Sequence, residues 1–397
     1  MSASSAAVDA APGARETPTA RLWRWEGRQL DPKNNSLNLI RLVLAALVLV
    51  AHAYYIAGRG VGPHLDGENI GGWAVFGFFA ISGYLITASR WSNSLGAYLV
   101  HRIARIYPAF LVCLVVTVCV FAPIGFLAQH GSLSGYLTTG TTPGAYLSLN
   151  ATLKMNAYDV AATPAAVPYP GAWNGSLWSL YYEFLCYLVI AALAVSSWVR
   201  RSPWGVALAF AVSVAGHAAM PRMLVLVGGH ADVQLLFKLL PLFLGGALVQ
   251  RLRAHLPLKA SWAAIALVVV AGAVWLLDGW GAQLTAPLIA YAILWVATVV
   301  PSPALIRTHD ISYGVYIYAF PVQQLLAMAG VHEWGLAAYD VIALACTVPL
   351  AAASWLLVER PVMRRVRAAR RGAPSSPTGA PHDSAQPAPA LTASAAG

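Results

Sequence analysis

The stretch from Leu37 to Ala57 reads LNLIRLVLAALVLVAHAYYIA, and it decides the fold. Apart from Asn38, Arg41 and His52, every residue in it is apolar or aromatic. A helix needs about 20 such residues to cross the hydrocarbon core of a bilayer, which is about 30 Å thick. The stretch therefore predicts a membrane-spanning helix that carries two titratable side chains.

The rest of the chain has the same character. Hydrophobic residues make up 58% of the 397 and charged residues only 10%, whereas soluble proteins carry about 25% charged residues. This excludes a soluble globular protein, and a disordered chain would be far less hydrophobic. The runs do not alternate as barrel strands do, and helices satisfy the backbone in lipid. We expect an all-α membrane protein with about ten transmembrane helices, at 37–57, 72–90, 106–128, 176–199, 204–220, 233–250, 260–278, 282–300, 311–329 and 336–358.

The positive charges are distributed unevenly between the two sides of these spans. The formal net charge is +10, which in a soluble protein would raise the question of nucleic acid. With ten spans, 20 of the 25 Lys and Arg fall on the side of the termini and three on the other, while Arg41 and Lys238 lie inside spans. Basic residues favour the cytoplasmic side. We therefore expect both termini in the cytoplasm, a lipid bilayer around the chain and no nucleic-acid partner.

The segments outside the spans divide the chain into three parts. Residues 1–35 and 363–397 are rich in Ala, Ser, Pro and Gly, which predicts disordered cytoplasmic ends around a membrane domain at 36–362. No cleaved signal peptide is expected. A long external loop is expected at 129–175, and loops of that length are often functional. The four cysteines lie in apolar runs without metal-ligand spacing, so no metal site is expected.

Arg41 and His52 are the first candidate functional residues, because ionisable groups inside a span are costly and often functional. They are 11 positions apart, which places them on one helix face about 16 Å apart along the axis. Imidazole suits proton transfer near neutral pH. The alternatives are an arginine that reaches the membrane surface and a histidine that is simply buried in the core.

Glu183 is an isolated carboxylate near the start of the fourth span, and Ser179 lies one turn before it. Because that span begins on the outer side, we expect Glu183 at a depth similar to that of His52. A carboxylate beside an imidazole orients the ring and raises its basicity. The alternative is a structural Glu183 held by Lys238 or by tyrosines.

Two further motifs lie near the predicted cytoplasmic side. Arg102 and Arg105 are three residues apart, so they are neighbours on one helix face and suit a phosphate-bearing ligand. From the spacing alone, ordinary positive-inside anchoring is the favoured interpretation of this pair. Ser82 and Gly83 indicate close helix packing, and Ser82 as a nucleophile is the less favoured interpretation.

Taken in order, six segments from about Asn35 to Arg365 resemble the bacterial membrane O-acyltransferases of the acyltransferase-3 family. Arg41-x10-His52 resembles the family's first-helix motif. The others are Gly77-Phe-Phe-Ala-Ile-Ser-Gly83, Arg102-Ile-Ala-Arg105-Ile-Tyr-Pro108, Trp178-Ser-Leu-Tyr-Tyr-Glu183, Ser312-Tyr-Gly-Val-Tyr316 with Pro321, and Val358-Glu-Arg-Pro361. This chain departs from the family pattern where Phe184 replaces a second Glu and Ala319 replaces a His.

The resemblance implies a bundle of ten helices in the bacterial inner membrane and a transfer reaction. An acyl group, usually acetyl, passes from cytoplasmic acyl-coenzyme A (acetyl-CoA) to a carbohydrate hydroxyl. By the matching motifs, His52 and Glu183 are catalytic, and Arg41, Arg102 and Arg105 bind the donor. The same motifs make Ser82, Trp178, Ser179 and Tyr313 candidates for substrate contact.

Two other functions remain open at this point. A polysaccharide transporter or flippase would explain the spans and buried charges, and a membrane sensor or scaffold would not need His52. The acceptor also stays open among exopolysaccharide, O-antigen, peptidoglycan, glycolipid and macrolide. The sequence also leaves open the identity of the acyl chain, the choice between direct transfer and an acyl-histidine relay, and the oligomeric state.

Overall fold

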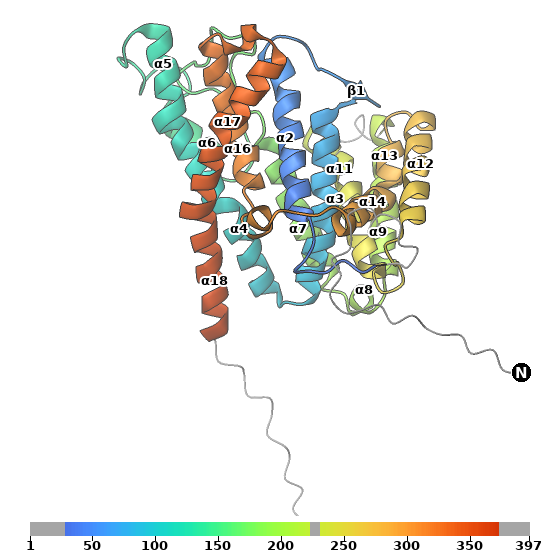
Figure 1. The fold of residues 1–397 in the computed structure, drawn as a ribbon. Helices are drawn as coiled ribbons and strands as arrows, with labels where there is room; N and C mark the ends of the chain where they lie inside the picture. Colours follow the sequence, from blue (N-terminus) through green and yellow to red (C-terminus); the bar gives the residue numbers. More distant parts are fainter. Residues whose placement is uncertain (1–27, 223–230, 373–397) are drawn as a thin grey trace, which may run out of the picture.

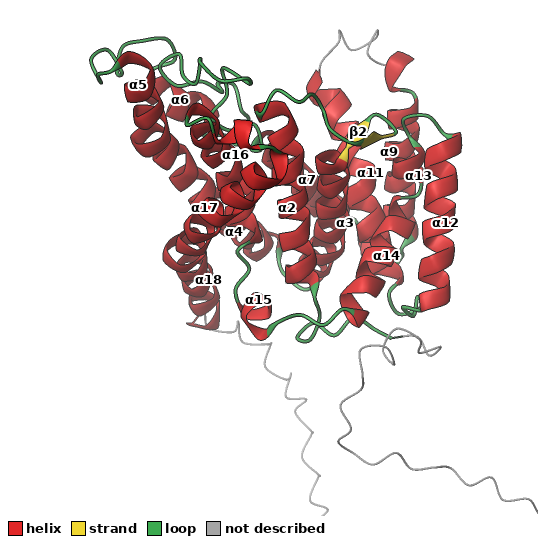
Figure 2. Cartoon of the chain, turned by 45° about the horizontal axis from the view of Figure 1, so that its top comes forward, coloured by secondary structure: helices red, strands yellow, loops and turns green. Residues whose placement is uncertain are grey.

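The protein is a bundle of helices that stand side by side (Figure 1). A computed structural model describes residues 28–222 and 231–372, so most of the two ends predicted to be disordered lies outside the described residues. Among the described residues, the only strands are β1 (His64–Leu65) and β2 (Glu68–Asn69), which form a small antiparallel hairpin (Figure 2). The expectation of an all-helical architecture is therefore confirmed.

Each of the ten predicted spans contains a helix. These helices are α2 (Leu37–Ile56), α3 (Ile70–Trp91), α4 (Leu95–Val116), α7 (Trp178–Leu193), α9 (Trp204–Ala218), α11 (Ala231–Leu252), α12 (Ala260–Leu276), α14 (Ala286–Val299), α16 (Ser312–Met328) and α17 (Leu336–Ser354). Two of them are extended through single π-helical turns, α4 through η1 (Thr117–Phe121) into α5 (Ala122–His130) and α17 through η3 (Trp355–Glu359) into α18 (Arg360–Gly372). The short helices are α6 (Pro143–Asn150), α8 (Ser197–Arg201), α13 (Gly281–Leu284), α15 (Ala304–Thr308) and η2 (Val331–Trp334).

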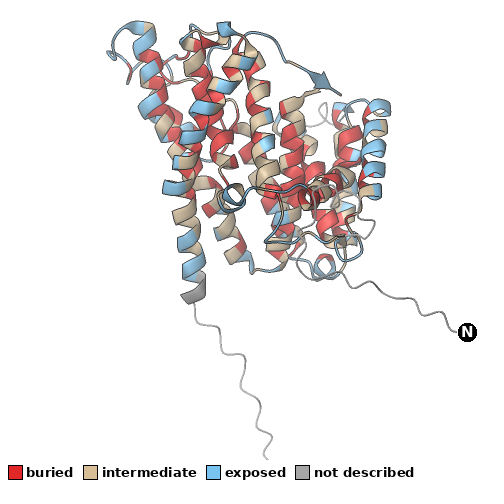
Figure 3. Ribbon diagram, in the orientation of Figure 1, coloured by how far each residue is buried: buried red, intermediate tan, exposed pale blue. Residues whose placement is uncertain are grey.

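Five helices are long and apolar enough to cross a membrane: α2, α3, α11 and the continuous helices at Leu95–His130 and Leu336–Ala369. Four shorter apolar helices, α7, α9, α12 and α14, accompany them. The lipid-facing character is clear on α12, where Trp275 is 85% exposed and Leu276 78%. Figure 3 shows the exposed outer side of this helix. Exposed apolar surface of this kind is rare in soluble monomers. Ten crossings and cytoplasmic termini stay predictions.

Two predicted boundaries are wrong. At residue 363, where the sequence predicts the start of a disordered tail, α18 continues the helix to Gly372. Its arginines are good helix formers, so the change from apolar to basic residues ends the apolar surface and not the helix. The third span begins at Leu95 and not at 106, with Ser94 capping its first turn by accepting from the Ala97 amide at 3.4 Å. Arg102 and Arg105 therefore lie well inside α4.

The predicted loop at 129–175 is a packed structure whose last part enters the bundle. Trp173 and Asn174 are fully buried. The Asn174 side-chain amide donates to the Ile317 carbonyl of α16 at 2.7 Å. Helix α7 consequently begins within the bundle, beside α16, and not at its outer edge.

Helices α3 and α11 approach each other closely at two glycines. A Cβ on Gly83 would lie 1.8 Å from the Phe243 carbonyl oxygen, and one on Gly246 would lie 2.0 Å from the Ala80 oxygen. Only glycine allows backbones to approach this closely. This contact fixes the height of α3 and therefore the position of Ser82 beside Gly83.

Candidate active site

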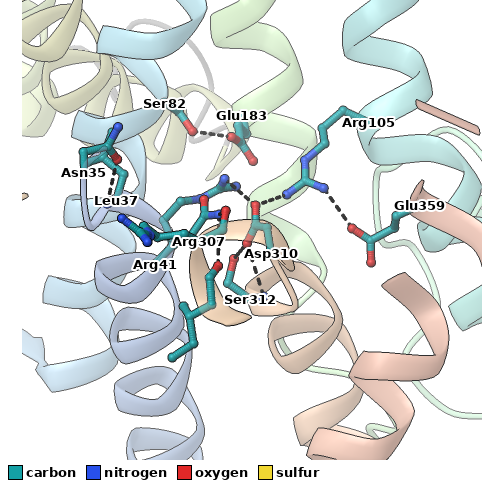
Figure 4. Close-up of polar contacts among 12 residues, drawn as sticks. Asn35, Leu37, Arg41, Ser82, Arg105, Glu183, Arg307, Asp310, Ser312 and Glu359 are labelled. Carbon is teal, nitrogen blue, oxygen red and sulfur yellow. Dashed lines mark hydrogen bonds and ion pairs between the residues drawn. The ribbon is translucent and has the colours of Figure 1, made fainter. Parts of the chain in front are cut away.

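A buried ion-pair network joins α2, α4, α16 and η3 at one end of the bundle (Figure 4). Asp310, just before α16, accepts from Arg41 at 2.8 Å and from Arg105 at 2.7 Å. Arg105 also donates to Glu359 at 2.9 Å, whose side chain is 1% exposed. Buried charges persist only when they are paired in this way.

Hydroxyl groups complete the network. Ser312 donates to Asp310 at 2.5 Å, and Ser354 donates to Glu359 at 3.1 Å. Burial by itself raises the pKa of Asp310, but Arg41, Arg105 and the Ser312 hydrogen bonds together hold that pKa below its ordinary value. Asp310 is therefore an anion that two predicted donor-binding arginines share.

Arg102 lies outside this network. Among the described residues it has no carboxylate partner, and its Nε is buried without a hydrogen-bond acceptor. Its guanidinium lies 5.9 Å from the centre of the Tyr187 ring. Of the three arginines predicted to bind the donor, Arg102 is the one whose charge is available for a ligand.

These arginines line a large basic cavity of about 650 Å³. Of the described residues in its wall, only Asp310 is acidic, whereas seven are arginines from four segments of the chain. They are Arg41, Arg102, Arg105, Arg307, Arg360, Arg364 and Arg367. A cavity with this charge concentrates polyanions, and guanidinium groups match phosphate oxygens geometrically.

Glu183 lies in a narrow pocket of about 40 Å³ that shares Arg41 and Ser82 with the basic cavity. Ser82 donates to the Glu183 carboxylate at 2.6 Å, and Tyr187 donates at 2.7 Å. Lys238 instead pairs with Glu68. The alternative in which tyrosines hold Glu183 is thus met in part, and the alternative through Lys238 is wrong.

The substrate candidates of the motifs divide into two groups. Ser82, Ser179 and Tyr313 line the pocket of Glu183. Ser179 shares a 2.6 Å hydrogen bond with Tyr316, and Tyr313 donates to the Ile106 carbonyl at 2.9 Å. Trp178 does not line that pocket, and its ring packs against Tyr182 with centroids 5.8 Å apart.

His52 lies elsewhere, and the expectation that it shares the depth of Glu183 is not met. Gly71 of α3 lies directly against Ala51, so it marks the level of His52. Ser82, which bonds Glu183, is 11 residues further along α3, or about 16 Å at 1.5 Å per residue. The physical reason is the buried start of α7, which places Glu183 near Arg41 instead of near the outer end of α2.

His52 sits among aromatic rings. The centre of its ring lies 5.0 Å from that of Phe320, edge to face, and 6.1 Å from that of Tyr55. Its Nδ1 is buried without a partner among the described residues. Tyr169, from the long loop at 129–175, packs on both Tyr55 and Phe320. The long loop therefore packs on the aromatic residues that surround the histidine.

Several residues of the site are not among the sequence-based candidates. Asp310 has no motif of its own, because its role depends on arginines more than 200 positions away. Glu359 belongs to the closing motif Val358-Glu-Arg-Pro361, which is a signal that could have identified it. Arg360, Arg364 and Arg367 follow a spacing of four and three residues, which indicates one helix face.

Comparisons with known proteins identify the family of the chain. The model of an acyltransferase domain family, acyltransferase-3, matches residues 34–356. An O-acetyl transferase of Shigella phage Sf6 is 29% identical over 347 residues, which cover 84% of this chain and 97% of that protein. Nodulation protein 10 of Rhizobium leguminosarum bv. viciae is 28% identical over 368 residues, covering 83% and 93%. No solved structure matches the chain. Because the family match spans most of the sequence, the chain belongs to the acyltransferase-3 family and is an acyltransferase.

Proposed function

We propose that the protein is an O-acetyltransferase of the bacterial inner membrane. It transfers an acetyl group from cytoplasmic acetyl-coenzyme A to a hydroxyl of a cell-surface or exported carbohydrate. The observation that carries the proposal is the basic cavity of about 650 Å³, which suits the phosphates of coenzyme A and joins a pocket inside the bundle. The O-acetyl transferase of the phage supports acetyl as the group and oxygen as the acceptor atom.

The arrangement of the candidates suggests a division of labour along the bundle. The nucleotide of the donor binds among the arginines, with Arg102 free to pair with phosphate. The pantetheine arm extends through the pocket lined by Arg41, Ser82 and Glu183. The arm is a long flexible chain, and its thioester would approach His52, about 16 Å further along the bundle.

His52 is the proposed base. It takes the proton of the acceptor hydroxyl while the oxygen attacks the thioester carbonyl, a C–O bond forms, and the C–S bond breaks. The proton then passes to the thiolate of coenzyme A. In the relay variant, the imidazole nitrogen attacks the thioester carbonyl first, so that an N–C bond forms, the C–S bond breaks, and coenzyme A leaves as the thiol with the imidazole proton. The acceptor oxygen then attacks the acetyl-imidazole, the N–C bond breaks, and the hydroxyl proton returns to the imidazole. An unpaired Nδ1 leaves the ring able to make a new contact with substrate.

The test uses purified protein in nanodiscs, supplied with radiolabelled acetyl-CoA and an extracted surface polysaccharide. We expect acetyl incorporation, with free coenzyme A appearing in equal amount, and without any ion gradient. His52→Gln should reduce the rate at least about 100-fold with unchanged thermal unfolding, because general base catalysis contributes about 10²–10⁴. Acetylated His52 trapped from acetyl-CoA alone would favour the relay.

A transporter or flippase is the competing function. It predicts substrate movement without consumption of acetyl-CoA, so an absence of coenzyme A release in the presence of polysaccharide would overturn the proposal. A sensor or scaffold predicts that His52→Gln behaves as wild type, and a fully active variant would exclude His52 from the chemistry.

A further inference from the structure

The helix α18 forms one wall of the basic cavity and projects beyond the rest of the bundle (Figure 1). Arg360, Arg364 and Arg367 all line the cavity. Their spacing of four and three residues places them in one row along the helix. From the first to the third the row rises about 10 Å, which is longer than a single phosphate group requires.

These three arginines differ from the other basic residues of the cavity. Arg41 and Arg105 are committed to Asp310 and Glu359. In the described part of the chain, no hydrogen bond or ion pair joins the three arginines of α18 to a carboxylate. Arg364 and Arg367 are exposed to solvent at the cavity mouth. The row is therefore a set of uncommitted cations that begins near the buried network and runs outward.

The π-helical turn η3 explains why the row faces the cavity. A π-helical turn adds one residue, which rotates the helix that follows it by about 100° relative to an uninterrupted α-helix. The last residue of this turn, Glu359, is held by Arg105 of α4 and by Ser354. The rotation of α18 is thus fixed by the same ion pair that closes the inner network.

Positive-inside anchoring alone does not explain this arrangement. Anchoring requires basic residues near the membrane surface, but it does not require their side chains to lie on the same face of a helix. Arg365 provides the contrast within the same helix. It is exposed, but it does not line the cavity. Arg102, in the same cavity, supplies a further guanidinium whose Nε is buried without a hydrogen-bond partner among the described residues.

We propose that the row Arg360, Arg364 and Arg367 binds the phosphate groups of the donor nucleotide and selects donors with two separated phosphate positions. The inner end of the row and Arg102 bind the diphosphate next to the pantetheine arm. The outer end binds the ribose phosphate. The enzyme then distinguishes acetyl-coenzyme A from acetyl-phosphopantetheine, which has a single phosphate. This inference rests on the proposed function.

The experiment compares Arg364→Gln and Arg367→Gln with the matched control Arg365→Gln in nanodiscs of phosphatidylcholine. Each variant removes one positive charge from the same helix. For acetyl-CoA we expect KM to rise about five- to tenfold in the first two variants, with kcat within a factor of two, and no change in the control. For acetyl-phosphopantetheine we expect a high KM in the wild type and little further change in Arg367→Gln.

An equal rise of KM in all three variants would mean a general charge effect and would overturn the inference. So would a wild-type enzyme that uses both donors with the same KM. The other phosphate group that the arginine row could bind is that of an anionic lipid headgroup. If the row binds lipid, Arg364→Gln will match Arg365→Gln in pure phosphatidylcholine and will differ from it only when phosphatidylglycerol is added.

A binding measurement separates this inference from the proposed function. Coenzyme A should raise the unfolding temperature of the wild type and of Arg365→Gln, and should raise it less in Arg364→Gln and Arg367→Gln. If the protein turns over no acetyl-CoA but this pattern holds, the nucleotide site stands and the proposed function fails. If turnover is normal and the four proteins respond alike, the inference fails and the proposed function stands.

Discussion

Replacing Gly83 with alanine tests how the contact between α3 and α11 sets the position of Ser82. The new Cβ would lie 1.8 Å from the carbonyl oxygen of Phe243, which is about 1.6 Å short of the 3.4 Å at which ordinary contact begins. The atom it meets belongs to a backbone and cannot turn aside. The two helices must therefore separate at this crossing.

The free-energy cost of the steric clash is partly offset by the higher helix propensity of alanine. Overpacking costs about 1–3 kcal/mol and occasionally more, and the rigid backbone contact places Gly83→Ala at the upper end. Alanine is about 1 kcal/mol better than glycine in a helix interior. We expect the free energy of unfolding to fall by about 2 kcal/mol, measured by denaturation of the protein in detergent micelles.

The rate of acetyl transfer should fall by more than the loss of folded protein explains. Ser82 precedes the substituted residue, and its hydrogen bond to Glu183 is only 2.6 Å long. A displacement of about 1 Å in a positioned group can cost about 100-fold in rate, so we expect a loss of at least about tenfold in acetyl transfer under conditions where the variant is fully folded.

The matched control is Gly272→Ala on α12, where no atom lies within 4 Å of the added Cβ. It should be as active as the wild type and more stable by up to about 1 kcal/mol. If Gly83→Ala shows the same stability and activity as this control, then the close approach of α3 and α11 does not hold the site, and the reasoning is wrong.

Two further substitutions test the charged groups. Glu183→Gln keeps the shape of the pocket but removes its charge, so we expect most acetyl transfer to be lost with little change in the unfolding curve; a rate near that of the wild type would remove Glu183 from the site. Asp310→Asn leaves Arg41 without its carboxylate partner. Removal of one partner from a buried ion pair lowers the free energy of unfolding by about 3–5 kcal/mol. The side chains of Arg41 and Asp310 are 22% and 11% exposed, so we expect a smaller loss of about 2 kcal/mol. Because the folded-state pKa of Asp310 is lowered, this stabilisation is present above the ordinary pKa of about 3.8 and is lost as the pH falls through the folded-state value. The difference in unfolding free energy between wild type and Asp310→Asn should thus be constant at neutral pH and shrink in acid, and a difference that grows in acid would contradict the ion-pair assignment.

Much of the bundle could be predicted because hydropathy is a local property. A run such as 37–57 must be a helix in lipid, whatever its neighbours do. The short distance between Arg41 and Arg105, through Asp310, could not be predicted in the same way. It depends on three segments that are far apart in the sequence, and nothing in the spacing of any one of them specifies a shared carboxylate.

The boundaries of the elements show the same limit. Apolar composition ends near residue 358, but α18 continues to Gly372 because helix propensity does not depend on hydropathy. The face of α18 on which the arginines lie then depends on the π-helical turn at Trp355–Glu359, and the amino-acid composition does not predict this turn. The basic cavity is a product of that turn and of the ion pair that holds it.

The sequence by itself determined that this is a helical membrane protein, and its ordered motifs indicated the acyltransferase family. The tertiary structure decided how the motif residues are grouped. It placed Glu183 with Ser82 and Arg41, and it left His52 about 16 Å away along the bundle. The reason is that Asn174, four residues before α7, is buried and donates a hydrogen bond to the Ile317 carbonyl. Helix α7 therefore begins inside the bundle. Depth in a bundle is set by such contacts between distant segments, whereas hydropathy and helical spacing record only what happens along one segment.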